Sequence, residues 1–100
     1  MPENLKAKDF EPHLNSNFRM HLSGGDPFDL ELIEVHEGIK SPIQEAFSIV
    51  FRGPKEAPRV SQIFTLEHAT MGTVQVFLSP FKVDEGGLYY EAIFNKLVKK

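Results

Sequence analysis

The sequence FSIVFRGP, from Phe47 to Pro54, alternates aromatic or β-branched residues with smaller or polar ones and ends in Gly-Pro. Two later stretches share this design, TVQVFLSP at 73–80 and LYYEAIFN at 88–95. Alternation with a period of two is typical of strands that have one buried face, and aromatic and β-branched residues favour strands. These three stretches therefore predict an all-β fold.

Three more strands are expected on the same grounds, at 18–22, 28–35 and about 61–68. In the second of them the apolar register slips by one residue between Leu32 and Ile33. A slip of this kind is what a β-bulge produces, and a bulge bends its strand. Clusters of Gly, Asp and Pro between the apolar stretches predict short connections, with a loop from Gly38 to Pro42.

One short helix is expected ahead of the strands, with Asp9 as its N-cap and 15–17 as its end. The fold class predicted from these elements is all-β: a small six-stranded antiparallel barrel or sandwich with one short N-terminal helix. The chain divides into a polar N-terminal extension at 1–8, a single β-domain at 9–95 and a basic C-terminal tail at 96–100. The helix is expected to cover an open end of the core.

The core is expected to be rich in phenylalanine, because the chain has nine Phe and no Trp. In the strand at about 61–68, either Phe64 or Ile63 faces inward, and the pattern leaves both registers open. Four rings on the remaining strands are predicted to be mostly buried at its centre: Phe47, Phe51, Phe77 and Phe94.

Composition limits the class of protein. One hundred residues make one domain, and a net charge of −3 with mixed signs disfavours nucleic acid as a partner. The absence of cysteine excludes disulfides, thiolate zinc sites and a cysteine nucleophile. No apolar run approaches the ~20 residues of a membrane-spanning helix, and the N-terminus lacks the apolar segment of a secretory signal. The prediction is a soluble, cytoplasmic protein without membrane insertion.

Reactive groups are sparse in the pattern, so the sequence predicts no catalytic residue, no cofactor and no metal site. His36 lies two residues after Glu34, and His68 follows Glu67, but a zinc site needs three or four ligands, so both are interpreted as solvated. The acidic pair 84–85 precedes two glycines in a turn, where solvation is expected. The histidines are not expected to cluster: His13, His21, His36 and His68.

Two features are candidates for binding a partner. The strand at 18–22 contains neither Pro nor Lys, which natural edge strands use to block unwanted pairing, so it is expected to be an open edge. Arg52 precedes the Gly-Pro turn and is expected either to meet a partner carboxylate or, as the favoured reading, to pair internally, for example with Glu91. The candidate partner-binding residues are Phe18, Met20, Leu22 and Arg52.

Several segments together resemble a small bacterial family of proteins whose domain has no known function. The likeness covers about Asp9 to Asn95 and lies in three motifs: Phe-Ser-x-x-Phe-Arg-Gly-Pro, Gly-x-x-x-x-Phe-Leu-x-Pro and Tyr-Glu-Ala-x-Phe-Asn. These motifs are structural, so the resemblance implies a shared fold rather than a mechanism. Similar proteins tend to be encoded beside phage-tail-collar-like fibre proteins, which implies an accessory role in such an assembly.

The function predicted from the sequence is a non-catalytic structural or assembly module that binds other protein subunits. The partner is expected to be either another copy of this chain or a fibre-like or tail-like protein. The protein would then be part of an assembled particle or fibre. The alternative is a β-barrel module that binds a small ligand or glycan in its mouth. An assembly module should expose an apolar patch or a strand edge, whereas a ligand-binding module should offer a concave pocket with converging polar groups.

Overall fold

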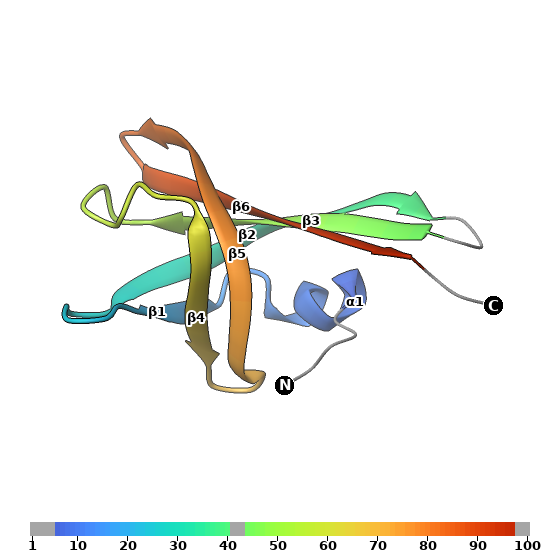
Figure 1. The fold of residues 1–100 in the computed structure, drawn as a ribbon, viewed down its shortest axis with the longest axis horizontal. Coiled ribbons are helices and arrows are strands. Elements are labelled where there is room, and N and C mark those ends of the chain that lie inside the picture. The colour runs from blue at the N-terminus through green and yellow to red at the C-terminus, as the bar shows by residue number, and fades with distance from the viewer. Residues whose placement is uncertain (1–5, 41–43, 98–100) are drawn as a thin grey trace.

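The computed structural model describes residues 6–40 and 44–97, and its six antiparallel strands close into a ring in the order β1-β2-β3-β6-β5-β4 (Figure 1). The predicted all-β, six-stranded class with one short N-terminal helix is confirmed. The elements in chain order are α1 (Ala7–Phe10), the 3₁₀ helix η1 (Glu11–His13), β1 (Asn17–His21), β2 (Phe28–Lys40), β3 (Gln44–Gly53), β4 (Gln62–His68), β5 (Gly72–Asp84) and β6 (Gly87–Leu97).

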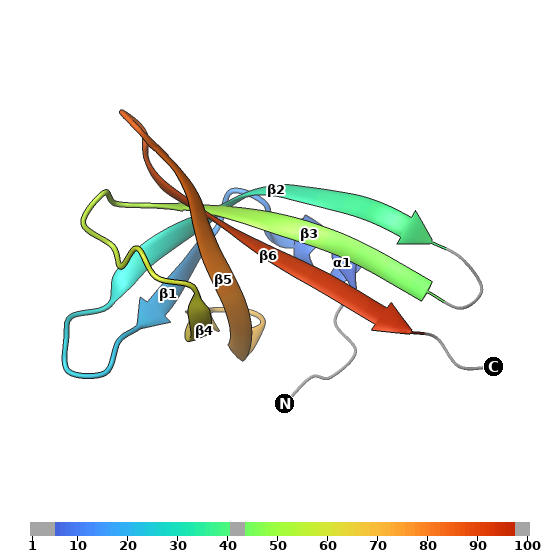
Figure 2. The ribbon, with the colours of Figure 1, turned by 45° about the horizontal axis from the view of Figure 1, so that its top comes forward.

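Three strands continue past the ring. The ladder between β1 and β2 runs as far as Glu31, and the ladder between β5 and β6 runs as far as Glu91. Beyond these points 34–40, 44–50 and 91–97 form a three-stranded extension, called the arm here, in which β3 pairs with both neighbours. Figure 2 shows the three strands side by side, with α1 on one face of the arm.

Two strands are longer than the sequence suggested. The prediction of a loop that begins at Gly38 is wrong, because β2 continues to Lys40. The other longer strand is β5, which runs through Pro80 to Asp84. In each strand the ladder continues with a register shift near the residue that resembles a strand end. The shift lies between Glu37 and Lys40 in β2 and between Pro80 and Lys82 in β5. The bulge expected near Leu32 is confirmed, since the register of β2 also shifts between Leu32 and Glu34.

The N-terminal helix begins earlier than predicted. Lys6 occupies the N-cap and Asp9 the third helical position, where its Oδ2 accepts a hydrogen bond of 2.8 Å from the Lys6 N–H. The prediction of Asp9 as the N-cap is therefore wrong, although its carboxylate still satisfies a backbone donor at the helix start. Phe10 is fully buried, with its ring centroid 6.1 Å from that of Phe47 and 5.7 Å from that of Phe94. Residues 6–16, called the cap here, therefore cover the inner face of the arm.

The interior of the ring is filled by side chains from all six strands. Phe51 is fully buried and Phe47 is buried, as predicted, while Phe94 packs at the border of the core. The prediction for Phe77 is wrong: it is 55% exposed, because Val74, Val76 and Leu78 take the inner face of β5. The fully buried side chains include Phe18, Met20, Leu30, Phe51, Phe64, Leu66, Leu78 and Tyr90.

The register of β4 is settled by its neighbour β5. Phe64 lies opposite Val76 and Leu66 opposite Val74, and all four point into the core. Ile63 lies opposite Phe77, and both side chains point outward. The burial of β4 thus follows the first of the two registers that the sequence left open.

Candidate functional site

The strand proposed as an open edge is paired on both sides. β1 forms ladders with β2 and with β4, so the prediction of an edge is wrong. Phe18 and Met20 are fully buried, and their side chains fill the barrel rather than face a partner. Leu22, just after the strand, is half-buried and packs against the core. Closure of the ring removes this strand from the candidate surface.

Arg52 is held within the fold. Its Nη2 donates to Glu31 Oε1 at 2.5 Å, and the two residues lie opposite one another on β3 and β2. The hydrogen bond and charge of Glu31, followed by a hydrogen bond with Tyr89, raise the pKa of the Arg52 guanidinium. The internal pairing favoured from sequence is confirmed, but its partner is Glu31 rather than Glu91. This pair ties the arm strands together at the point where they leave the ring.

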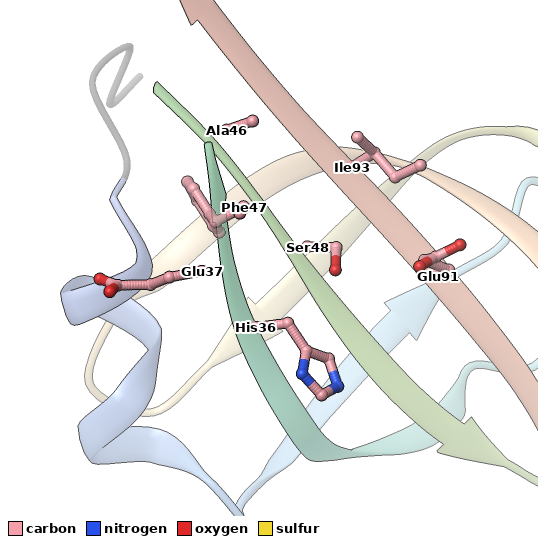
Figure 3. Close-up of a pocket in the computed structure, with 8 residues that line it drawn as sticks. His36, Glu37, Ala46, Phe47, Ser48, Glu91 and Ile93 are labelled. Atoms are coloured by element: carbon pink, nitrogen blue, oxygen red, sulfur yellow. The ribbon is translucent and has the colours of Figure 1, made fainter. Parts of the chain in front are cut away.

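The outer face of the arm carries a row of side chains that are at least partly exposed. His36, Ser48 and Ile93 lie in one row across β2, β3 and β6. Figure 3 shows Ser48, His36 and Glu91 beside one another, with Ile93 standing above β6. Ile93 is 70% exposed. Together with Ala46 and Glu37, these residues border a shallow hollow of about 290 Å³.

The next row of the same face has an apolar centre between two carboxylates. Val50 lies between Glu34 and Glu91 in register and is almost fully buried. Glu34 Oε1 is 2.6 Å from His36 Nε2, and both side chains are more than half exposed, which confirms the solvated reading of this pair. The outer face of the arm therefore exposes the large apolar side chain of Ile93 beside polar and acidic groups.

Other exposed apolar side chains lie on the ring. Ile63 and Phe77 form an outward cross-strand pair on β4 and β5, and Ile63 is 64% exposed. Phe81, at the register shift of β5, lies 6.4 Å from Tyr89 between ring centroids, and Lys82 Nζ lies 4.6 Å from the centre of the Tyr89 ring. These groups provide well-matched comparisons for any test of the arm.

His68 differs most from its sequence interpretation. It is 7% exposed, so the solvated reading is wrong. Its Nδ1 accepts hydrogen bonds from the backbone N–H groups of Thr70 at 3.0 Å and Met71 at 3.1 Å. Its Nε2 lies 2.9 Å from Ser16 Oγ. Because Nδ1 accepts two donors, the ring proton is on Nε2 and is donated to Ser16.

A second histidine ring contacts this one at a tilted angle. The centroids of the His13 and His68 rings are 4.5 Å apart, and Phe18 packs on His68 at 4.4 Å. The expectation that the histidines would not cluster is therefore wrong. Burial, and secondarily the charge of His13, lower the pKa of His68. Within residues 6–40 and 44–97, no group of three or more His, Asp or Glu side chains is arranged to hold a metal ion.

The Ser16–His68 contact is not arranged for nucleophilic catalysis. A serine nucleophile must donate its hydroxyl proton to an unprotonated histidine nitrogen. Here the Ser16 hydroxyl donates to the His13 carbonyl oxygen at 2.5 Å, and His68 donates to Ser16. The chain of hydrogen bonds from the β4–β5 turn through His68 and Ser16 to η1 instead joins two segments of the fold.

The adjacent surface is polar and internally paired. A hollow of about 560 Å³ is lined by Asn17, Arg19, Asp29, Glu67 and His68, with Ala69 and Gly72. Arg19 Nε lies 3.4 Å from Asp29 Oδ1, and His21 Nε2 lies 2.9 Å from Glu67 Oε1. Elsewhere, the Tyr90 hydroxyl donates to the Pro58 carbonyl oxygen, and burial raises the pKa of Tyr90 to about 12. These polar groups are thus satisfied by neighbours within the chain.

Comparisons with known proteins give a family. No helix in the described part of the chain has the length and apolar character needed to cross a membrane. No curated protein and no solved structure matches the sequence. Residues 5–94 match the family model of a domain of unknown function, DUF6916. Because this match spans nearly the whole sequence, the chain belongs to the DUF6916 family.

Proposed function

We propose that this chain is a non-catalytic structural or assembly module that binds other protein subunits through the outer face of the arm. The observation that carries the proposal is the exposed row of Ile93, Ser48 and His36 on strands that project beyond the closed ring. A sheet face in this position can be covered by another protein without opening the core.

The composition of this face supports protein binding. The core of a protein–protein interface is depleted in charge, and its rim is polar. Ile93 and the half-buried Ala46 supply the accessible apolar surface, beside the already buried Val50, while Glu34 and Glu91 supply polar neighbours. Covering the exposed Ile93 side chain removes apolar surface from water, and this burial favours binding by about 25 cal/mol per Å² of area covered. The gain depends on a partner that also satisfies or avoids the two carboxylates.

The proposed partner is a second copy of this chain or a subunit of a fibre-like or tail-like assembly. The second of these rests on the family resemblance, since similar proteins tend to be encoded beside phage-tail-collar-like fibre proteins. An accessory subunit of such an assembly needs a stable scaffold and a docking face rather than reactive groups. The closed ring supplies the scaffold, and the arm supplies the face.

The alternative function is binding of a small ligand or glycan. The mouth of the barrel is a poor location for it, because the interior is filled by side chains such as Phe51 and Tyr90. The hollow on the arm, at about 290 Å³, lies at the lower end of the range of about 300–1,000 Å³ for ligand pockets. Ser48 and His36 would then serve as its polar groups.

The proposed function predicts that Ile93→Lys disrupts assembly and Ile63→Lys does not. Both positions are exposed isoleucines on strands, 70% and 64% exposed, but only Ile93 lies on the arm. A new lysine at position 93 would have to lose its hydration when a partner docks. This desolvation costs free energy unless the partner supplies an opposite charge. Sedimentation velocity over a concentration series measures self-association, and co-purification of the untagged protein from its host measures docking on other subunits.

Two results would contradict the proposal. One is a wild-type chain that stays monomeric at every concentration and retains no host protein. The other is equal retention of the same partner by both lysine variants, which would place the interface away from the arm. The first result moves the ligand-binding alternative ahead, and a screen of glycans by ligand-observed NMR would then test the hollow directly; the second keeps protein binding but moves it to another surface.

A further inference from the structure

We propose that His68 makes the seating of the cap on the barrel depend on pH, so that acidification loosens the cap and uncovers the aromatic surface under Phe10. The inference is independent of the proposed docking function. It rests on the geometry around one buried imidazole, which joins the β4–β5 turn to the cap.

The imidazole fits its site only in the neutral form. Nδ1 faces two backbone N–H groups, from Thr70 and Met71, and accepts a hydrogen bond from each. A proton added at Nδ1 would point at these two donors, so both hydrogen bonds would be replaced by repulsion between N–H groups. Nε2 already carries its proton, so Nδ1 is the nitrogen that acid protonates. The charged ring therefore has to leave its position.

Departure of the ring removes the contacts that hold the second half of the cap. His68 donates to Ser16 and contacts the His13 ring, and both residues belong to the cap. The cap and β2 are also joined there, since the Leu32 N–H donates to the Ser16 carbonyl and the Asn15 N–H donates to the Leu32 carbonyl. Once Ser16 loses His68, these two backbone hydrogen bonds become the next to open.

The surface under the cap is aromatic. The Phe47 and Phe94 rings stack at 4.5 Å with an interplanar angle of 5°, and Phe10 packs against both. Phe10 and Ala7 are buried only because the cap is seated on the arm. Loosening of the cap would thus expose apolar surface on the inner side of the arm, opposite the outer face proposed to bind protein.

The charged neighbours of His68 do not offset its protonation. His13 on η1 contacts the ring and adds a like charge when it is itself protonated. Glu67 on β4 is engaged by His21, and Asp29 on β2 is engaged by Arg19 of β1. The carboxylates near His68 are therefore already paired. The protonated His68 ring would instead face the imidazole of His13.

The direction of the pH effect follows from the lowered pKa of His68. Burial holds this pKa below the ordinary value of 6.5, so the folded, capped state binds the proton less tightly than the released state. The contribution of neutral His68 to the stability of the capped state is therefore complete above pH 6.5. It is lost as the pH falls below 6.5 toward the pKa of His68 in the capped state. The cap should be seated at neutral pH and loosened in mild acid.

Hydrogen exchange on the intact chain tests the inference. Between pH 7.5 and pH 5, corrected for intrinsic exchange, protection of the Thr70, Met71 and Asn15 amides should fall by about tenfold for each pH unit between 6.5 and the pKa of His68 in the capped state, and should level off below that pKa. The Ile49 amide, in the middle of β3, should not change over this range. In His68→Gln the protection of the three amides, corrected in the same way, should no longer depend on pH, whereas His36→Gln, at an exposed histidine, should behave as wild type.

A second measurement needs no variant. ¹⁵N imidazole NMR of the wild-type chain should show His68 as the Nε2–H tautomer, titrating below 6.5, and amide protection should fall between pH 6.5 and that pKa. Binding of a hydrophobic dye should rise over the same range. An Nδ1–H tautomer, a pKa at or above 6.5, or amide protection whose midpoint follows another histidine would overturn the inference, as would unchanged pH dependence in His68→Gln.

Discussion

Replacing Phe51 with alanine should lower the free energy of unfolding by about 3–5 kcal/mol, the cost of truncating a large buried ring without collapse of the space it leaves. Phe51 is fully buried in the ring, and its side chain packs edge-on against Phe18 at 5.2 Å between centroids. It also lies opposite Leu32 on one side and Tyr90 on the other. Strands on both sides limit the ability of the backbone to close the cavity.

Phe77→Ala is the matched control, because it removes the same atoms from a strand position that faces outward. Phe77 is more than half exposed, so its truncation should cost less than about 1 kcal/mol. Urea denaturation followed by circular dichroism gives both values from the same experiment. Equal losses at the two positions would show that the burial of β5 is inverted relative to the structure described here.

The strands were predictable because period-2 alternation is a local property. The register of a strand is also local when one face is strongly apolar, and Val74, Val76 and Leu78 show this for β5. The mistake at Phe77 came from treating aromatic content as evidence of burial. Large apolar side chains are often exposed, so the alternation of the whole strand outweighs the identity of one residue.

Closure of the ring was not predictable from the same pattern. Whether β1 is an edge depends on its ladder with β4, which is distant in the sequence. The lack of Pro and Lys in β1 fits a doubly paired strand equally well. The arm was missed for a related reason: Gly38 and Pro80 resemble strand ends, but bulges let β2 and β5 continue past them.

His68 could have been found from the sequence. It follows Phe64 and Leu66 at spacings of two, so it belongs to the inward face of β4. A polar side chain on that face must be buried with its hydrogen bonds satisfied, and a turn of three residues after it offers backbone donors. The partner Ser16 could not have been found, because its contact with His68 depends on how the cap folds back on the barrel.

Gly87→Ala should destabilise the fold by about 3 kcal/mol or more, through backbone strain together with a steric clash. Gly87 begins β6 at a φ of +140°, a conformation that side chains other than glycine rarely adopt. A Cβ at this position would lie 2.2 Å from the Gly53 carbonyl oxygen. The backbone cannot move away easily, because Gly53 pairs with Leu88 at the next position.

Gly24→Ala separates the strain from the clash. Gly24 has a φ of +80°, and a Cβ there would meet no described atom within 4 Å. Its substitution should cost about 1–2 kcal/mol, the penalty of a left-handed conformation alone. The difference between the two variants in urea denaturation then reports the close approach of Gly53 at the end of β3 to Gly87 at the beginning of β6, the ends of these strands that lie away from the arm. A Gly87→Ala variant as stable as Gly24→Ala would contradict this close approach.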